Sequence, residues 1–312
     1  MKVLSIVLSF RNEEKNIPEL IKRLTETLKK LSDWEYQLIF VNDDSTDNSE
    51  QILLEKQKIF PIKIINMSRR FGNLPCVLAG LKNATGDAII YMDSDLQDPP
   101  EIIPDLIKKF EEGYEVVHTK RTKRLGENKI KMLLTKVAYL AINKTSNIPL
   151  GVNVGDFKLL SKNVLNHMNS LTEFNPYLRG LSVWVGFKQT HVEYVRQARF
   201  SGDSKFRNLF SGPFAEFIRG ITSFSTSLLY LGIFFGLIAI LFSILLTIYA
   251  FYAKFSGIAI PGSSGILIVS CFFSGTILTF LGIIGIYIAR IYEQTQGRPH
   301  YIIKSIKDNK KL

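Results

Sequence analysis

Cysteine and histidine are scarce in this sequence. Its 312 residues include two cysteines and four histidines. Cys76 and Cys271 lie in segments of very different composition, which argues against a disulfide framework and against a cysteine-based metal site. The histidines are scattered without the spacing of a zinc site, so we interpret them as core or surface residues.

Two common nucleotide-binding motifs are also absent. The chain has neither a Gly-x-Gly-x-x-Gly motif nor a Gly-Lys-Ser/Thr loop. Because Rossmann dehydrogenases and P-loop nucleotidases hold phosphates on such turns, their absence argues against both classes.

Acidic residues are few relative to basic ones: 28 Asp and Glu against 39 Lys and Arg leave a net charge of +11. This excess favours an anionic partner, which could be nucleic acid, a phosphorylated ligand or an anionic membrane surface.

Two long apolar segments lie in the last third of the chain. Residues 228–253 and 265–289 contain no charged residue, and each exceeds the roughly 20 residues that cross a bilayer core. The short connector between them carries one charge, Lys254. We therefore predict a transmembrane hairpin of two helices. Lys and Arg residues are frequent on both flanks of the hairpin, which predicts that both flanks face the cytoplasm.

The preceding residues show alternating strand and helix patterns. Continuous apolar runs predict strands buried on both faces, and apolar residues at helical spacing predict helices between them. The predicted strands cover residues 3–10, 36–42, 62–66, 88–92 and 116–119, and the predicted helices cover residues 16–31, 49–58, 73–82 and 101–112. Such alternation favours an α/β fold with a parallel, doubly wound sheet, in which ligands bind beyond the carboxyl ends of the strands.

Polar residues follow the first, second and fourth predicted strands, as expected of one shared site. Asp93 and Asp95 come directly after the fourth strand, and Gln97 follows them. Two carboxylates in this arrangement can bind one hard cation, Mg²⁺ or Mn²⁺, with Gln97 as a further oxygen donor. The alternative for an isolated D-x-D pattern is a polar turn at the end of a strand.

Several motifs together give the chain a family resemblance. They are SFRNEE at 9–14, NDDSTD at 42–47, RRFGN at 69–73, DSDLQDPP at 93–100, GDF at 155–157, LRGL at 178–181, WVGF at 184–187, the Arg199-x-x-Gly202-x-Ser204-Lys205 loop and GRP at 297–299. With these motifs the chain resembles the inverting family-two glycosyltransferases of the GT-A fold, which has a Rossmann-like, mostly parallel sheet. Within that family it is most similar to the polyprenyl-phosphate glycosyltransferases, which include dolichol-phosphate mannose synthases and bactoprenol glucosyltransferases.

The resemblance implies a nucleotide site in the first two loops. Glu13 and Asp43 correspond to residues that hold the base and ribose, and Asp47 supports their loop. The sequence departs from the family pattern at Asn42, where an Asp is usual, and at Asp44, where a Gly is usual. Asp tolerates the left-handed backbone conformation better than most residues other than Gly.

The resemblance also implies a metal and diphosphate site. Asp93, Asp95 and Gln97 correspond to the ligands of Mg²⁺ or Mn²⁺ and to the sugar-diphosphate site. Arg199 and Lys205 correspond to a loop that clamps the diphosphate. A basic cluster attracted to anionic lipid is the alternative for these two residues, and both roles are compatible.

The implied acceptor is a lipid phosphate. Asp95 and Asp156 are the expected catalytic residues, and we predict that Asp156 positions a substrate more than it accepts a proton, because the second pKa of a phosphate is about 6. Arg121 corresponds to an acceptor-phosphate residue, and Lys120 and Arg124 lie in the same basic run after the fifth strand. The alternative for this run is a solvated basic segment.

Two basic amphipathic segments are predicted at residues 129–144 and 206–221. They would either lie in the membrane interface or pack on the domain core. The expected organisation is a cytoplasmic GT-A domain over residues 1–208, a juxtamembrane amphipathic helix over 209–227, the hairpin over 228–289 and a basic cytoplasmic tail over 290–312. These expectations describe a multi-pass protein of the cell (inner, cytoplasmic) membrane with both termini in the cytoplasm.

The expected reaction is inverting transfer of a sugar from a nucleotide sugar to undecaprenyl or another polyprenyl phosphate for cell-envelope glycosylation. UDP-glucose or a UDP-N-acetylhexosamine is the expected donor. Beyond these substrates and the membrane, the resemblance implies a homo-tetramer, a separate flippase and a downstream glycosyltransferase as partners, and no nucleic acid. Two alternatives stay open: a processive polysaccharide synthase, although the Gln-x-x-Arg-Trp motif is absent, and a catalytically degenerate membrane scaffold.

Overall fold

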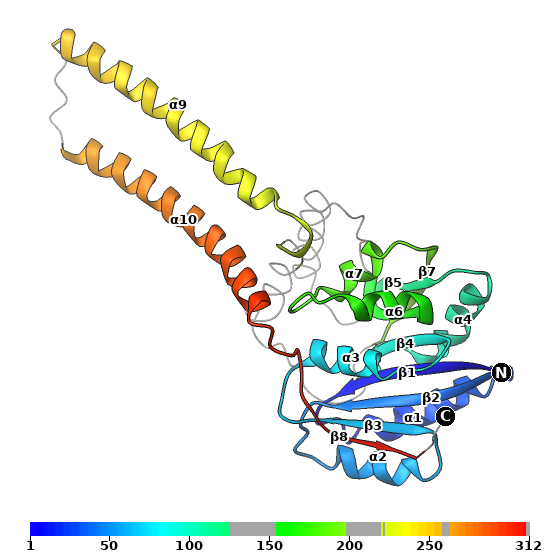
Figure 1. The fold of residues 1–312 in the computed structure, drawn as a ribbon. Coiled ribbons are helices and arrows are strands. Elements are labelled where there is room, and N and C mark those ends of the chain that lie inside the picture. The colour runs from blue at the N-terminus through cyan, green and yellow to red at the C-terminus, as the bar shows by residue number, and fades with distance from the viewer. Residues whose placement is uncertain (125–153, 198–219, 221, 258–262, 310–312) are drawn as a thin grey trace. The chain divides into compact units, whose positions relative to one another are not determined.

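The computed structural model describes residues 1–124, 154–197, 220, 222–257 and 263–309 of the chain (Figure 1). The chain divides into two compact units. The first consists of Met1–Gly220 together with Pro299–Leu312, and the second is Ile221–Arg298.

The first unit is built on one eight-stranded sheet with the strand order β7-β5-β6-β4-β1-β2-β3-β8. Neighbours among β1 to β4 are parallel, as are β5 and β7, whereas β6 runs antiparallel to β4 and β5, and β8 runs antiparallel to β3. The strands are β1 Lys2–Phe10, β2 Trp34–Asn42, β3 Ile62–Met67, β4 Ala88–Asp93, β5 Val116–Arg124, β6 Val154–Ser161, β7 Gln189–Arg196 and β8 Ile303–Asp308. The predicted α/β fold with a mostly parallel sheet is confirmed.

Helices cover both faces of this sheet because its central strands are apolar on both faces. Leu4, Ile6 and Leu8 of β1 belong to a core shared with α1 and α4. On the other face α3 approaches closely, since a Cβ added at Gly80 would lie 2.2 Å from Cγ1 of Val7. Among the described residues of the unit, the helices are α1 Ile17–Leu28, α2 Ser49–Gln57, α3 Asn73–Lys82, α4 Ile103–Glu111, α6 Lys162–Ser170 and α7 Leu178–Trp184, with the 3-10 helix η1 at Pro100–Ile102.

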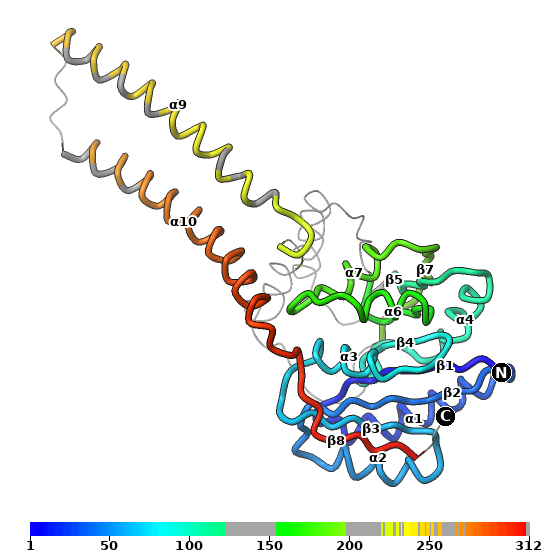
Figure 2. The backbone as a smooth tube through the Cα atoms, viewed as in Figure 1, coloured from blue at the N-terminus to red at the C-terminus, as the bar shows by residue number. Residues whose placement is uncertain are grey.

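The structure corrects the end of the fifth strand and adds elements that the sequence did not predict. β5 continues to Arg124, so the basic run of residues 120–124 lies within the strand and not after it. The additional elements are β6, α6, α7, β7 and β8. β8 comes from the tail after residue 298, for which only a basic segment was predicted, and it forms the edge of the sheet beside β3 (Figure 2).

The second unit contains two long helices, α9 Ser227–Phe255 and α10 Ser263–Thr295. One segment of the described residues, Phe272–Thr295, is long and apolar enough to be a candidate membrane span. The apolar segment found in α9, Phe234–Leu246, is shorter than the roughly 20 residues that a bilayer core requires. The structure thus supports one candidate span where the sequence predicts a hairpin of two.

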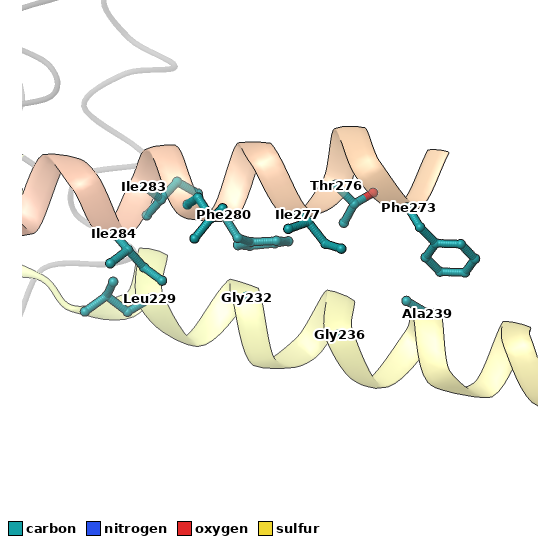
Figure 3. A pocket seen from close by; sticks show the side chains of 11 residues that line it. Leu229, Gly232, Gly236, Ala239, Phe273, Thr276, Ile277, Phe280, Ile283 and Ile284 are labelled. Atoms are coloured by element: carbon teal, nitrogen blue, oxygen red, sulfur yellow. The ribbon is translucent and has the colours of Figure 1, made fainter. Parts of the chain in front are cut away.

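Small residues of α9 face larger apolar residues of α10 across a cavity (Figure 3). Gly232, Gly236 and Ala239 lie on one side of it, and Phe273 and Phe280 lie on the other. A Cβ added at Gly232 would lie only 3.0 Å from the Phe280 ring, so glycine permits this helix approach. Small residues are the usual contacts where membrane helices pack closely.

Candidate active site

The loop after β4 places two carboxylates at the carboxyl end of the sheet. Asp93 is the last residue of β4, and the Ser94 hydroxyl donates a hydrogen bond to the carbonyl of Ser9 at 2.8 Å, which ties the loop to β1. Leu96 is buried in a left-handed conformation with φ of 60°, and the Gln97 amide donates to Oδ1 of Asp95 at 3.2 Å. The loop therefore turns sharply and holds Asp95 in a buried position.

Asp156 joins these carboxylates from the neighbouring strand β6. The antiparallel register pairs Ala88 with Ser161 and ends at the pair of Tyr91 and Lys158, and Asp93 and Asp156 lie two residues beyond that last pair. The Asp156 carboxylate lies near enough to Asp93 to raise its pKa. Successive side chains of a strand alternate between faces, so both carboxylates project from the face that Tyr91 and Lys158 share. The sequence predicted both residues but not the strand that brings them together.

The Asp93 carboxyl lies in a strongly anionic environment. Burial raises the pKa of Asp93 to about 7, and the nearby carboxylates of Asp95, Asp98 and Asp156 contribute to the increase. Asn73 donates a hydrogen bond to Oδ1 of Asp93 at 3.3 Å. This concentration of negative charge is what a divalent cation would neutralise.

The donor set suits a cation that also uses ligands from a substrate. Among the described residues, no group of three or more His, Cys, Asp or Glu side chains is arranged to hold a metal ion. Mg²⁺ is usually held by one or two carboxylates together with phosphate oxygens and water, and Mn²⁺ accepts similar oxygen ligands. Asp93 and Asp95 fit that pattern, whereas they do not form a complete site made of protein ligands alone.

Asp156 forms a two-point ion pair with Arg179 at the start of α7. Nε of Arg179 donates to Oδ1 at 2.8 Å and Nη2 donates to Oδ2 at 2.5 Å. Burial disfavours the charged carboxylate, but Arg179, with smaller contributions from Lys158 and Arg121, outweighs this effect and holds the pKa of Asp156 well below its usual range. Asp156 is therefore ionised at neutral pH and is a weak base.

The predicted nucleotide residues lie in loops that hold one another. Oδ1 of Asp43 accepts hydrogen bonds from the backbone amides of Phe71 at 2.6 Å and Gly72 at 3.1 Å. The Glu13 amide donates to the Ser49 hydroxyl at 2.9 Å, and its carboxylate accepts from Asn16 at 2.5 Å. Both carboxylates are buried at the carboxyl end of the sheet, where the fold places ligands.

The two departures from the family pattern have structural roles. Asp44 adopts the left-handed conformation with φ of 56°, as expected where glycine is usual. The Asn42 amide donates to Oδ1 of Asn66 at 3.0 Å, and its carbonyl oxygen accepts from the Ser45 amide at 2.9 Å. A carboxylate at position 42 could not donate the first of these hydrogen bonds, so Asn suits the neighbour that this chain has at position 66.

Two of the three predicted acceptor cations, Lys120 and Arg121, have different partners in the structure. Lys120 pairs with Glu193 at 2.8 Å on one face of the sheet. Arg121 is 9% exposed on the opposite face, where its Nε donates to the Tyr194 hydroxyl at 2.9 Å and its Nη2 lies 3.6 Å from Asp98. Arg124 ends β5, and its side chain lies outside the described residues. A strand alternates its side chains, so Lys120 and Arg121 project from opposite faces of the sheet, and their shared role around one anion stays a prediction.

Asp98 is the centre of the buried network that holds Arg121. Its carboxylate is 1% exposed, accepts a hydrogen bond from the Tyr194 hydroxyl and lies 3.6 Å from both Arg121 and Arg196. The Gln197 amide also donates to the carbonyl of Gln97 at 3.0 Å. The end of β7 is thereby tied to the loop that carries Asp95.

Replacing Asp98 with Ala should destabilise the folded protein by about 3 kcal/mol, because two largely buried guanidinium groups would lose their counter-charge. Thermal unfolding of the wild-type protein and the variant in the same detergent measures the effect. Glu193→Ala is the matched control, since it removes an exposed ion pair and should leave the melting temperature nearly unchanged. Equal melting temperatures for Asp98→Ala and the wild type would show that the network does not stabilise the fold.

Some residues of the candidate site were not predicted from the sequence, and some predicted residues lie outside the described part of the chain. The roles of Arg179, Lys158 and Asp98 were not predicted; the only sequence signals were the LRGL motif, a lysine two residues after Asp156, and the second half of the DSDLQDPP motif. Arg199, Lys205 and the predicted amphipathic segments 129–144 and 206–221 lie outside the described residues, except for Gly220.

The fold and the carboxylate site together define a GT-A-like glycosyltransferase domain, and comparison with known proteins gives the family. A model of glycosyl transferase family 2 matches residues 5–168. The chain is 40% identical to the uncharacterized glycosyltransferase YkcC of Bacillus subtilis, over 99% of this chain and 96% of that protein. It is 37% identical to a bactoprenol glucosyl transferase of Shigella phage SfX, over 98% of this chain and 100% of that protein. The chain belongs to glycosyl transferase family 2, and the predicted resemblance is confirmed.

A solved structure supports the same fold. Mannosyl-3-phosphoglycerate synthase from Rubrobacter xylanophilus matches with a TM-score of 0.51 and 15% sequence identity, over 71% of this chain and 73% of that chain. At this identity the likeness concerns the fold alone.

Proposed function

We propose that this glycosyltransferase transfers a sugar from a nucleotide sugar to a polyprenyl phosphate with inversion at the anomeric carbon. The observation that supports the proposal most is that the carboxylates of Asp93, Asp95 and Asp156 lie close together near the ends of β4 and β6. Arg179 forms an ion pair with Asp156. The relatives named bactoprenol glucosyl transferase, similar over the full length of the chain, support a lipid phosphate as the acceptor.

The donor would bind at the carboxyl end of the sheet. Glu13 and Asp43 lie in the loops proposed for the nucleotide, and Asp93, Asp95 and Gln97 are the proposed ligands of Mg²⁺ or Mn²⁺. When bound, such a cation neutralises charge on the diphosphate leaving group. Arg199 and Lys205 are proposed to close over the same diphosphate.

The acceptor phosphate oxygen is the nucleophile in this proposal. It forms a bond to the anomeric carbon while the bond from that carbon to the diphosphate oxygen breaks on the opposite face, and the nucleoside diphosphate leaves with the electron pair. The second pKa of a phosphate is about 6, so the acceptor needs no base at neutral pH. The ionised Asp156, held by Arg179, fits a residue that positions a substrate.

The proposal places the acceptor at a membrane surface. The candidate span Phe272–Thr295 supports membrane attachment, and we propose that α9 is the second span of a hairpin with both flanks in the cytoplasm. Arg121 and Lys120 are proposed to bind the acceptor phosphate. Arg121 lies beside Asp98, whereas Lys120 would have to break its ion pair with Glu193 before it could bind the phosphate.

The test is a transfer assay with the purified full-length protein in detergent, undecaprenyl phosphate and Mn²⁺ or Mg²⁺. A panel of radiolabelled UDP-sugars is offered, and label is followed into lipid that is extracted by organic solvent and released by mild acid. Transfer from one donor supports the proposal and identifies the sugar. If folded protein transfers from no UDP-linked or GDP-linked sugar, the degenerate scaffold replaces the proposal, and a long water-soluble polymer as product would indicate a processive synthase.

A further inference from the structure

Lys158 is a fully buried lysine directly behind the candidate active site. It lies on β6 two residues after Asp156, so the two side chains share one face of the sheet. Its side chain is 0% exposed. Burying an ammonium group is costly unless its charge and its hydrogen-bond donors are compensated, which makes its surroundings informative.

The described contacts of this ammonium group are neutral. Nζ of Lys158 donates a hydrogen bond to the Ser182 hydroxyl at 2.7 Å and lies 5.9 Å from the centroid of the Tyr91 ring. Among the described residues, no carboxylate lies within the 4.0 Å of an ion pair with it. A methionine would fill similar apolar space without this desolvation cost, so packing alone gives no reason for a lysine here.

Ser182 connects Lys158 to Arg179. Ser182 is itself fully buried on α7, and its hydroxyl donates to the carbonyl oxygen of Arg179 at 3.0 Å. The lysine thus holds the turn of α7 from which Arg179 reaches Asp156. Burial lowers the pKa of Lys158 to about 7 and the Asp156 carboxylate opposes that decrease, so the charge of the lysine depends on the carboxylate beside it.

We propose, building on the function proposed above, that Lys158 is a positioning residue for the Asp156–Arg179 pair. Through Ser182 it fixes the first turn of α7, so that both guanidinium hydrogen bonds to Asp156 form. When protonated, its ammonium group also stabilises the charged Asp156 carboxylate. The pair is then held in place before either substrate binds, as precise catalytic geometry requires.

The test compares three variants of the full-length protein in detergent. Lys158→Met removes the charge and keeps much of the volume, and Ser182→Ala removes only the link to α7. Leu160→Ala is the matched control, because Leu160 lies two residues further along the same face of β6, is fully buried and pairs with Ile89 in the sheet. Steady-state kinetics are measured for both substrates, and hydrogen exchange is followed in peptides covering α7 and α4.

Lys158→Met should lower kcat by about 10- to 100-fold while the KM for the nucleotide sugar changes less than about threefold. Exchange should accelerate in α7 and stay unchanged in α4. Ser182→Ala should reproduce the faster exchange with a smaller loss of kcat, because the charge is retained. Leu160→Ala should lower the melting temperature and leave the kcat of the folded protein close to that of the wild type.

The proposal is overturned if Lys158→Met keeps kcat within about twofold of the wild type, or if exchange in α7 is the same in all variants. If Lys158→Met does not fold, Ser182→Ala decides by the same two measurements. If the wild-type protein transfers sugar to no lipid, the proposed function fails, and the exchange measurement still decides whether Lys158 holds α7.

Discussion

Replacing Asp95 with Asn should reduce sugar transfer at least about 1,000-fold, because the variant loses one of the two carboxylates proposed to hold the cation at the diphosphate. Asp95 is buried at the turn after β4, and its Oδ1 accepts the Gln97 amide. An asparagine carbonyl can accept the same hydrogen bond, so the loop should keep its conformation. The measurement is the rate of label transfer into lipid, at saturating nucleotide sugar.

Asp105→Asn is the matched control for this variant. It makes the same chemical change at an exposed position in the first turn of α4 and should leave the transfer rate unchanged. If Asp95→Asn kept more than about a tenth of wild-type activity, the charge at position 95 would not carry the effect expected of a cation ligand.

A second measurement on the same variant does not depend on turnover. Divalent cation with a nucleoside diphosphate should raise the melting temperature of the wild-type protein, because a ligand that binds only the folded state stabilises it. The cation-dependent part of this shift should be absent in Asp95→Asn. In the absence of the cation the variant should be at least as stable as the wild type, since Asp95 contributes to the repulsion that Asp93 experiences.

The sequence predicted the central strands well because burial on both faces produces a signal that is independent of context. Every residue of β1 from Leu4 to Phe10 is buried, and the printed sequence shows the corresponding apolar run. β6 escaped prediction because it lacks a continuous apolar run: Asp156 and Lys158 alternate with Phe157 and Leu159, and the charged type of Lys158 gives no sign that its side chain is fully buried. The strand that was hardest to recognise is therefore one that carries the candidate site.

The edge strands were missed for a different reason. β8 alternates between partly buried and exposed residues, and its sequence is basic, so that it looks like a solvated tail. Its place in the sheet depends on tertiary contacts: Lys307 pairs with Glu50 at 2.8 Å, and Ser305 accepts a hydrogen bond from Asn66 at 3.1 Å. No local pattern contains those partners, because more than 200 residues separate them along the chain.

Candidate site residues were predictable as residue types but not as an arrangement. Asp93 and Asp156 are distant in sequence, and only the antiparallel register of β4 and β6 makes them neighbours. The basic run of β5 shows the opposite error: Lys120 and Arg121 are adjacent in sequence, and the alternation of a strand separates them. The net charge therefore indicated an anionic partner, whereas the strand order and register were needed to show which of these residues lie near one another.

Replacing Asp156 with Asn should lower kcat about 100-fold, and the pH dependence of kcat/KM for the lipid should stay the same. The amide cannot neutralise Arg179, so the two-point ion pair at 2.8 and 2.5 Å is lost and the guanidinium is free to adopt other positions. The wild-type protein should lose kcat/KM for the lipid as the pH falls through about 6, where the acceptor phosphate takes up a proton. Asp156 cannot cause that loss, because Arg179 holds its pKa well below the usual range and the carboxylate stays ionised there. Burial raises the pKa of Asp93 to about 7, so the assay uses saturating divalent cation and nucleotide sugar, which keep Asp93 ionised.

The fall of kcat/KM at low pH, here called the acidic limb of the pH profile, distinguishes two possible roles of Asp156. If Asp156 positions a substrate, Asp156→Asn moves the whole pH profile down and keeps the limb near pH 6, because the limb belongs to the phosphate. If Asp156 were the base, the limb would disappear in the variant along with the group that titrates. Glu193→Gln is the control, since it neutralises an exposed carboxylate on the other face of β7 and should change neither the rate nor the limb. A limb that vanishes only in Asp156→Asn would show that proton transfer, and not the ion pair with Arg179, is what this carboxylate contributes.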